Sequence, residues 1–216
     1  MAKVEGNGVF YSLLESAVVK VDSAKKTKVL FIFDNMELSG AEKVALNLLR
    51  NCASSESLEA RGAICMDDKL SSNWEGSMVE HLGAGIPPGG SLISRVLRGF
   101  KLLPRLASLC AWADIVIPVT PPAVLWAGVA GKWAGKPVAP WVHYDLDGLE
   151  REGLAQGRKV RDWLMLRLYK SFIPNFRRIV FVSNQTKASY IKRRRHLHPA
   201  KKSSVLTNDN DASGLS

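Results

Sequence analysis

Apolar residues follow two patterns along this chain: short unbroken runs, and longer segments in which they recur every three or four positions. The first run, Val29–Phe33, has the length and the β-branched and aromatic content of a central parallel strand covered on both faces. From Ala41 the apolar residues change to helical spacing. Residues 28–50 therefore predict one strand–turn–helix unit.

The same alternation continues to the end of the chain. Apolar runs predict further strands at 61–66, 114–119, 138–143, 178–183 and 204–206. Helical spacing predicts helices at 74–82, 91–111, 121–134, 158–172 and 185–193. Because strands and helices alternate over mostly short connections, the predicted fold class is α/β, with a mostly parallel sheet and helices on both faces.

Length and composition fit one such domain. The chain has 216 residues, of which 46% are apolar, enough to bury a sizeable core. We expect an N-terminal extension over 1–27, the domain over 28–207 and a polar tail over 208–216. The formal net charge of +10 predicts an anionic partner: nucleic acid, an acidic membrane or a phosphorylated substrate.

Cysteine usage and apolar segments bear on where the protein acts. The three cysteines Cys52, Cys65 and Cys110 are odd in number and lack CxxC spacing, which is typical of reduced core thiols in a cytosolic protein. The N-terminus lacks the continuous apolar segment of a signal peptide. Prolines interrupt the most apolar region, 115–131, so it is too broken to span a membrane. We expect a soluble or peripheral protein.

The turn between the first strand and the first helix is a candidate anion site. Gly40 can adopt a positive φ, and it has no Cβ to keep an anion away from the backbone amides. The helix that follows adds free N–H groups and the positive end of its dipole. Any tight strand-to-helix turn also favours glycine, so Ser39–Gly40 alone leaves a purely structural interpretation open.

Further polar residues follow the predicted strands. Ligands gather at the carboxyl ends of parallel strands, where this sequence places Asp34, Asn35, Ser39, Gly40, Thr120, His143, Asp145, Ser183 and Asn184. His143 is suited to hydrogen-bond a sugar or phosphate, or to act as an acid or base near neutral pH. The alternative is a structural histidine bonded to a carbonyl or to Asp145. Ser183–Asn184 equally suits the cap of the helix predicted from Gln185.

Several chemistries have no motif in this sequence. No His/Cys cluster has metal-ligand spacing, so no metal is expected. The absence of GxSxG, GxxxxGK[ST] and a full GxGxxG argues against a serine hydrolase, a P-loop enzyme and a typical dinucleotide enzyme. No cofactor is therefore expected.

In combination, these features resemble the N-terminal half of family 4 glycosyltransferases, which have the GT-B fold. The matching elements cover roughly Lys28 to Asp211: the Gly-Gly-Ala-Glu-Arg-like turn at Ser39–Lys43, the Asp-hydrophobic strand at Asp114–Val119, the strand ending in histidine at Trp141–His143, the Val-Ser strand end at Phe181–Ser183, and the closing strand and turn at Val205–Asp211. Ser39 stands where the family has its first glycine. The resemblance implies a single Rossmann-like domain whose tail lies at the interdomain hinge position.

The resemblance also implies an activity. It suggests the acceptor-side domain of an enzyme that transfers a sugar from a nucleotide-sugar to a glycan or lipid-linked acceptor. A C-terminal donor domain with a Glu-x7-Glu element would complete it, and this chain has no room for one, so a separate donor-domain polypeptide is an expected partner. By analogy the catalytic residue would be His143, and the substrate- or phosphate-binding residues would be Ser39, Gly40, Thr120, Asp145, Ser183 and Asn184.

Two basic helix faces bear on membrane binding. In the family, such a face commonly holds the enzyme on an anionic membrane; here the cations are Arg95, Arg98, Lys101, Arg105, Arg158, Lys159, Arg167 and Lys170. Each cation adds about 1 kcal/mol near an acidic leaflet. We expect a cytoplasmic protein that is peripheral on the inner face of the membrane. Simple solvated faces are the alternative.

Two other functions stay open. One is a non-catalytic basic binding module, and the other is an inactive remnant of a longer enzyme. Nucleic acid is the weaker choice of anionic partner, because the sequence has no RNP-like motif, helix-turn-helix pattern or zinc module.

Overall fold

The computed structural model describes residues 26–34, 40–65, 79–82 and 92–142, and in the C-terminal part 167–169, 172, 173, 176, 178–181, 186–188, 190–192 and 204–206. The chain divides into two compact units. One comprises Asp22–Ala139, and the other comprises Met1–Val21 together with Pro140–Ser216.

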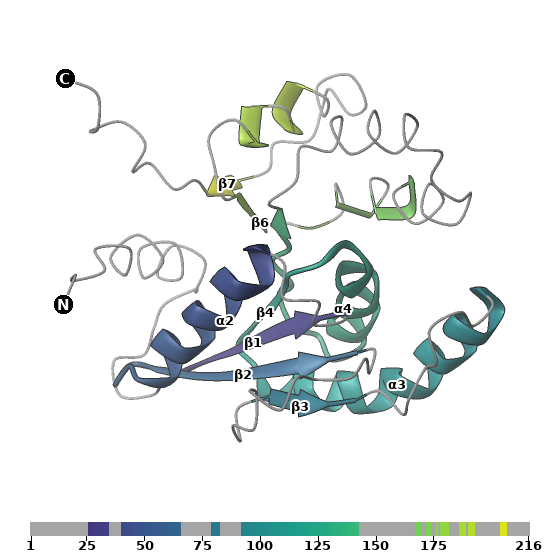
Figure 1. Ribbon diagram of the computed structural model, residues 1–216, viewed down its shortest axis with the longest axis horizontal. Coiled ribbons are helices and arrows are strands. Elements are labelled where there is room, and N and C mark those ends of the chain that lie inside the picture. The colour runs from purple at the N-terminus through teal and green to yellow at the C-terminus, as the bar shows by residue number, and fades with distance from the viewer. Residues whose placement is uncertain are drawn as a thin grey trace. The chain divides into compact units, whose positions relative to one another are not determined.

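A four-stranded parallel sheet forms the centre of the 22–139 unit (Figure 1). Its order is β3-β2-β1-β4, with β1 at Thr27–Phe33, β2 at Leu58–Ile64, β3 at Val79–His81 and β4 at Ile115–Pro118. Residues Val29–Phe33 of β1 are fully buried, because β1 is an inner strand and helices cover both of its faces. This confirms the central parallel strand predicted from the first apolar run.

Helices cover both faces of this sheet. Helix α2 (Gly40–Ala53) packs on one face, where Leu49 approaches Gly62 of β2 so closely that an added Cβ would lie 3.1 Å from its Cδ2. Helices α3 (Leu92–Trp112) and α4 (Pro121–Trp133) share a core with Leu30, Ile32 and Val116 on the other face. Figure 1 shows α2 and α3 on opposite sides of the sheet. The predicted α/β class is confirmed.

The 140–216 unit contains a second parallel sheet. Its order is β5-β6-β7, with β5 at Trp141–Val142, β6 at Arg178–Phe181 and β7 at Ser204–Leu206. Helical residues at 167–169 and 172 fall in the predicted helix 158–172, and those at 186–188 and 190–192 fall in the predicted helix 185–193. The ring of Tyr190 packs on Phe181 of β6 with 5.2 Å between centroids.

The helix predicted at 74–82 is wrong over its last residues. Val79–His81 forms β3, which pairs in parallel with Gly62–Ile64 of β2. The N–H of Leu82 then donates to the carbonyl of Ile64 at 3.0 Å. Backbone pairing with a neighbouring strand outweighs the helical spacing of so short a segment. Residues 74–78 lie outside the described residues.

The strand predicted at 138–143 divides between the two sheets. Val138 forms a single parallel bridge to Val116 of β4, whereas Trp141–Val142 pairs with β6. Pro140 lies between them and has no N–H to donate to either sheet; its carbonyl accepts from the N–H of Val180 at 2.9 Å. This proline falls where the chain changes from one sheet to the other.

Helix α4 begins and ends as its sequence predicts. Pro121 and Pro122 occupy its first turn, and Gly135 follows its end with φ 68°. The N–H of Lys136 donates to the carbonyl of Gly131 at 2.8 Å, and that of Gly135 donates to Lys132 at 3.2 Å. These two bonds form a Schellman motif, in which glycine adopts the left-handed conformation without a Cβ penalty.

The three cysteines are free and buried, as predicted for core thiols. Burial raises the pKa of Cys52 and of Cys110 to about 12. The pKa of Cys65 is raised as well, by burial first and then by the nearby Asp34 carboxylate and Cys110. Within the described parts of the chain, no helix has both the length and the apolar character needed to cross a membrane.

Candidate functional site

The candidate site lies at the carboxyl edge of the four-stranded sheet. Hydrogen bonds continue one residue past the strands there: the N–H of Cys65 donates to Phe33 and the N–H of Val119 donates to Ile32, both at 2.9 Å. Asp34 and Thr120 follow these bonds directly. Their backbone positions are therefore fixed by the sheet.

Thr120 joins the ends of β1 and β4. The backbone N–H of Asp34 donates to Thr120 Oγ1 at 3.1 Å, and Thr120 is only 6% exposed. Although Thr120 is the N-cap residue of α4, its side chain makes no capping hydrogen bond. The two residues that follow it are prolines, which have no N–H groups to cap. The hydroxyl accepts from Asp34 instead.

The two helix N-termini at this edge differ in how many N–H groups they offer an anion. Helix α4 starts with two prolines and so lacks two of the four free donors of a helix start. Helix α2 starts at Gly40 and has no proline in its first turn. Of the two, α2 is the better anion site, because it keeps its donors and the positive end of its dipole.

Glu42, in the first turn of α2, is a residue that the sequence analysis did not single out. Its side chain is only 4% exposed, which is rare for a carboxylate. Its negative charge shares the positive end of α2, so it lowers the net potential that a phosphate would meet there. The Ser-x-x-Glu spacing of Ser39 and Glu42 is the capping-box pattern, which would have drawn attention to it.

The structure brings together part of the predicted site. It places Thr120 against Asp34 and places Gly40 at the start of α2. The other predicted site residues, Ser39, His143, Asp145, Ser183 and Asn184, lie outside the described residues. In the residues that the structure describes, no group of three His, Cys, Asp or Glu side chains is arranged to hold a metal ion.

The strands that precede His143 and Ser183 are parallel neighbours. Val142 of β5 is in register with Phe181 of β6. Both strands therefore end at the same edge of the second sheet, which is the arrangement assumed when the two residues were assigned to one site.

The chain matches the sequence model described as "Glycosyltransferase Family 4" over residues 38–208. It belongs to this family. No curated protein sequence matches it.

Solved structures of similar fold are GT-B glycosyltransferases. Anabaena HepE in complex with UDP and glucose is 16% identical, with a TM-score of 0.55 over 84% of this chain and 44% of HepE. The lipopolysaccharide outer core galactosyltransferase WaaB in its apo form is 19% identical, with a TM-score of 0.55 over 77% of this chain and 42% of WaaB. The family 4 domain thus spans less than half the length of these two proteins and has the fold of one half of GT-B.

Proposed function

We propose that this family 4 domain is the acceptor-side half of a sugar transferase. In this proposal a C-terminal donor domain completes the enzyme, which moves a sugar from a nucleotide-sugar to a glycan or lipid-linked acceptor. The observation that carries the proposal is the start of α2 at Gly40, an open helix N-terminus at the carboxyl end of the inner strand β1, within a family 4 domain.

The donor is proposed to be a nucleoside diphosphate sugar. HepE has been solved in complex with UDP-glucose, in a structure 14% identical to this chain with a TM-score of 0.56. The amides at the start of α2 would hold part of the diphosphate, and Ser39 would add a hydroxyl. The donor domain would supply the contacts to the base and ribose.

His143 is proposed to act on the acceptor. An imidazole titrates near neutral pH, so it can accept a proton from the attacking hydroxyl or hydrogen-bond the acceptor sugar. Asp145 would orient this histidine, while Ser183, Asn184 and Thr120 would line the same edge. A lipid-linked acceptor would place the protein on the inner face of the cytoplasmic membrane.

Transfer from a panel of radiolabelled nucleotide-sugars, UDP-glucose included, to membrane lipids tests the proposal. The chain is assayed with and without the polypeptide encoded downstream. We expect transfer only in the mixture, because the chain alone lacks the donor contacts. His143→Ala should reduce transfer about 100-fold or more, as expected for loss of a general acid or base.

His81→Ala is the matched histidine control, because His81 is an exposed residue at the end of edge strand β3. It should leave transfer unchanged. If neither the chain nor the mixture binds a nucleotide-sugar or transfers one, the proposal is wrong. A basic binding module without catalytic activity, as the net charge of +10 suggests, would then be the better interpretation.

A further inference from the structure

The outer side of α4 carries apolar side chains that the protein leaves in contact with solvent. Its inner residues, such as Ala123 and Ala127, are fully buried. On the outer side, however, Val129 is 42% exposed and Trp133 is 65% exposed. A solvent-facing helix side is ordinarily polar, so this one is unusual.

Phe100 of α3 extends the same surface. Its neighbour Gly99 lies against the ring of Trp126, since an added Cβ would come within 2.0 Å of Trp126 Cη2. Phe100 itself is 61% exposed. Trp126, Val129 and Trp133 are spaced by three and four positions and so follow one another along a single side of α4. We call this set, Phe100, Trp126, Val129 and Trp133, the α4 stripe.

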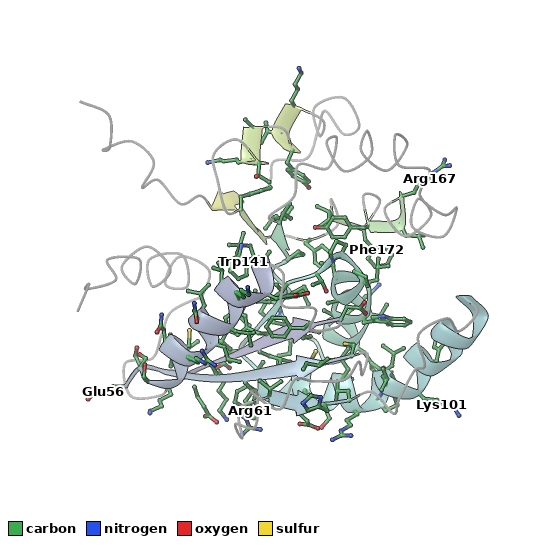
Figure 2. The ribbon with its side chains drawn as sticks, viewed as in Figure 1. Glu56, Arg61, Lys101, Trp141, Arg167 and Phe172 are labelled. Carbon is green, nitrogen blue, oxygen red and sulfur yellow. The ribbon has the colours of Figure 1, made fainter. Side chains whose placement is uncertain are left out.

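Lysines flank the stripe, and acids do not. Lys101 follows Phe100, Lys132 precedes Trp133, and Lys136 comes three residues after it. Figure 2 shows Lys101 projecting from α3 away from the sheet. Among the described residues, none of these three lysines forms an ion pair, whereas Arg105 is bound to Glu80 at 2.7 Å. The only acid between residues 99 and 139 is Asp114, which accepts from the N–H of Lys28.

We propose that the α4 stripe docks on an anionic lipid bilayer. Phe100 and Trp133 enter the interface between headgroups and acyl chains, where aromatic side chains are favoured, and the lysines meet the lipid phosphates. A second copy of the chain is a poorer occupant, because it would bring like charges together. This surface is distinct from the basic faces marked by the sequence, one of which has Arg105 engaged by Glu80.

Co-sedimentation of the full chain with vesicles tests this docking. The vesicles are phosphatidylcholine alone, or phosphatidylcholine with about one-third phosphatidylglycerol. We expect binding to the anionic vesicles at physiological ionic strength and little binding to the neutral ones. Phe100→Ser with Trp133→Ser should weaken it about tenfold or more, because the aromatic insertion is lost. Lys101→Gln with Lys132→Gln and Lys136→Gln should weaken it several-fold and reduce its salt dependence.

Val44→Ser and Lys43→Gln on α2 are matched controls, since both side chains are exposed on the helix that covers the other face of the sheet. They should bind vesicles like the parent chain. Brominated lipid should quench the tryptophan emission of the parent chain, and Trp133→Phe should remove most of that quenching.

Equal vesicle binding by the parent and the Phe100/Trp133 variant would overturn the proposal, as would failure of the parent to bind anionic vesicles. The assay contains no nucleotide-sugar, so its result is independent of the proposed sugar transfer.

Discussion

At the scale of single residues, the bond between Asp34 and Thr120 holds the edge where the candidate site lies. Thr120→Val keeps the shape of the side chain but leaves the Asp34 N–H without this acceptor. An unsatisfied buried donor costs about 1–3 kcal/mol. We therefore expect the free energy of unfolding to fall by that amount in urea denaturation.

Thr120→Ser is the control, because it retains the hydroxyl and loses only a methyl group. It should lie closer to the parent chain than Thr120→Val does. A stability of Thr120→Val equal to that of the parent would show that the hydroxyl is not needed to join the two strands.

The sequence could mark Thr120 as a residue at a strand end but could not show what its hydroxyl binds. Asp34 and Thr120 are 86 positions apart, and only the pairing of β1 with β4 brings them together. The prolines after Thr120, which leave its hydroxyl free of capping, were visible in the sequence. Their consequence for the hydroxyl depends on that long-range pairing.

At the scale of elements, α3 and α4 approach each other at Gly99. Alanine at an open helical position is favoured over glycine by about 1 kcal/mol. At Gly99, however, an added Cβ would lie 2.0 Å from the Trp126 ring, so one of the helices must move. Overpacking of this kind costs about 1–3 kcal/mol. We expect Gly99→Ala to destabilise the protein, as measured by chemical denaturation.

Trp126→Ala provides the test of cause. In that background the added methyl group meets no ring, so Gly99→Ala should become neutral or stabilising. If Gly99→Ala costs the same with and without the Trp126 ring, the contact is not what requires glycine at position 99.

Elements with strong periodicity were predictable, and short ones were not. Residues 91–111 carry enough helical repeats to identify α3, which runs from Leu92 to Trp112 through Pro104. Strand β3 is only three residues long, and its pairing with β2 decides its conformation. The stripe on α4 escaped notice for a related reason: a helix that is apolar all round gives no sign of which side its neighbours will cover.

At the scale of the whole molecule, the described strand pairs form two parallel sheets within a family 4 domain. The order of the motifs from Ser39 to Ser183 was enough to indicate this family. The division of residues 138–143 between the sheets was harder to anticipate, because apolar content does not reveal which strand a segment will pair with. Most of the candidate site follows strands of the second sheet, and its geometry remains a prediction.

The buried thiols predict how the stability of the whole molecule depends on alkaline pH. Cys52 and Cys110 have pKa values raised from 9.0 to about 12. Between these values the unfolded chain loses its thiol protons and the folded chain keeps them, so the free energy of unfolding falls as pH rises. Each thiol contributes about 1.4 kcal/mol per pH unit. Thermal melts should therefore show constant stability below about pH 8.5 and a steep loss above pH 9.

Lysines and tyrosines also titrate in this range, so the slope must be compared between variants. Cys52→Ala with Cys110→Ala removes two of the titrating thiols, and its stability should fall less steeply with pH between about 9 and 11, whatever its absolute value. The lost sulfur atoms lower stability equally at every pH and leave the slope untouched. Parallel curves for the parent and the variant would mean that these thiols ionise as readily in the folded protein as in the unfolded chain, and that burial does not hold them protonated.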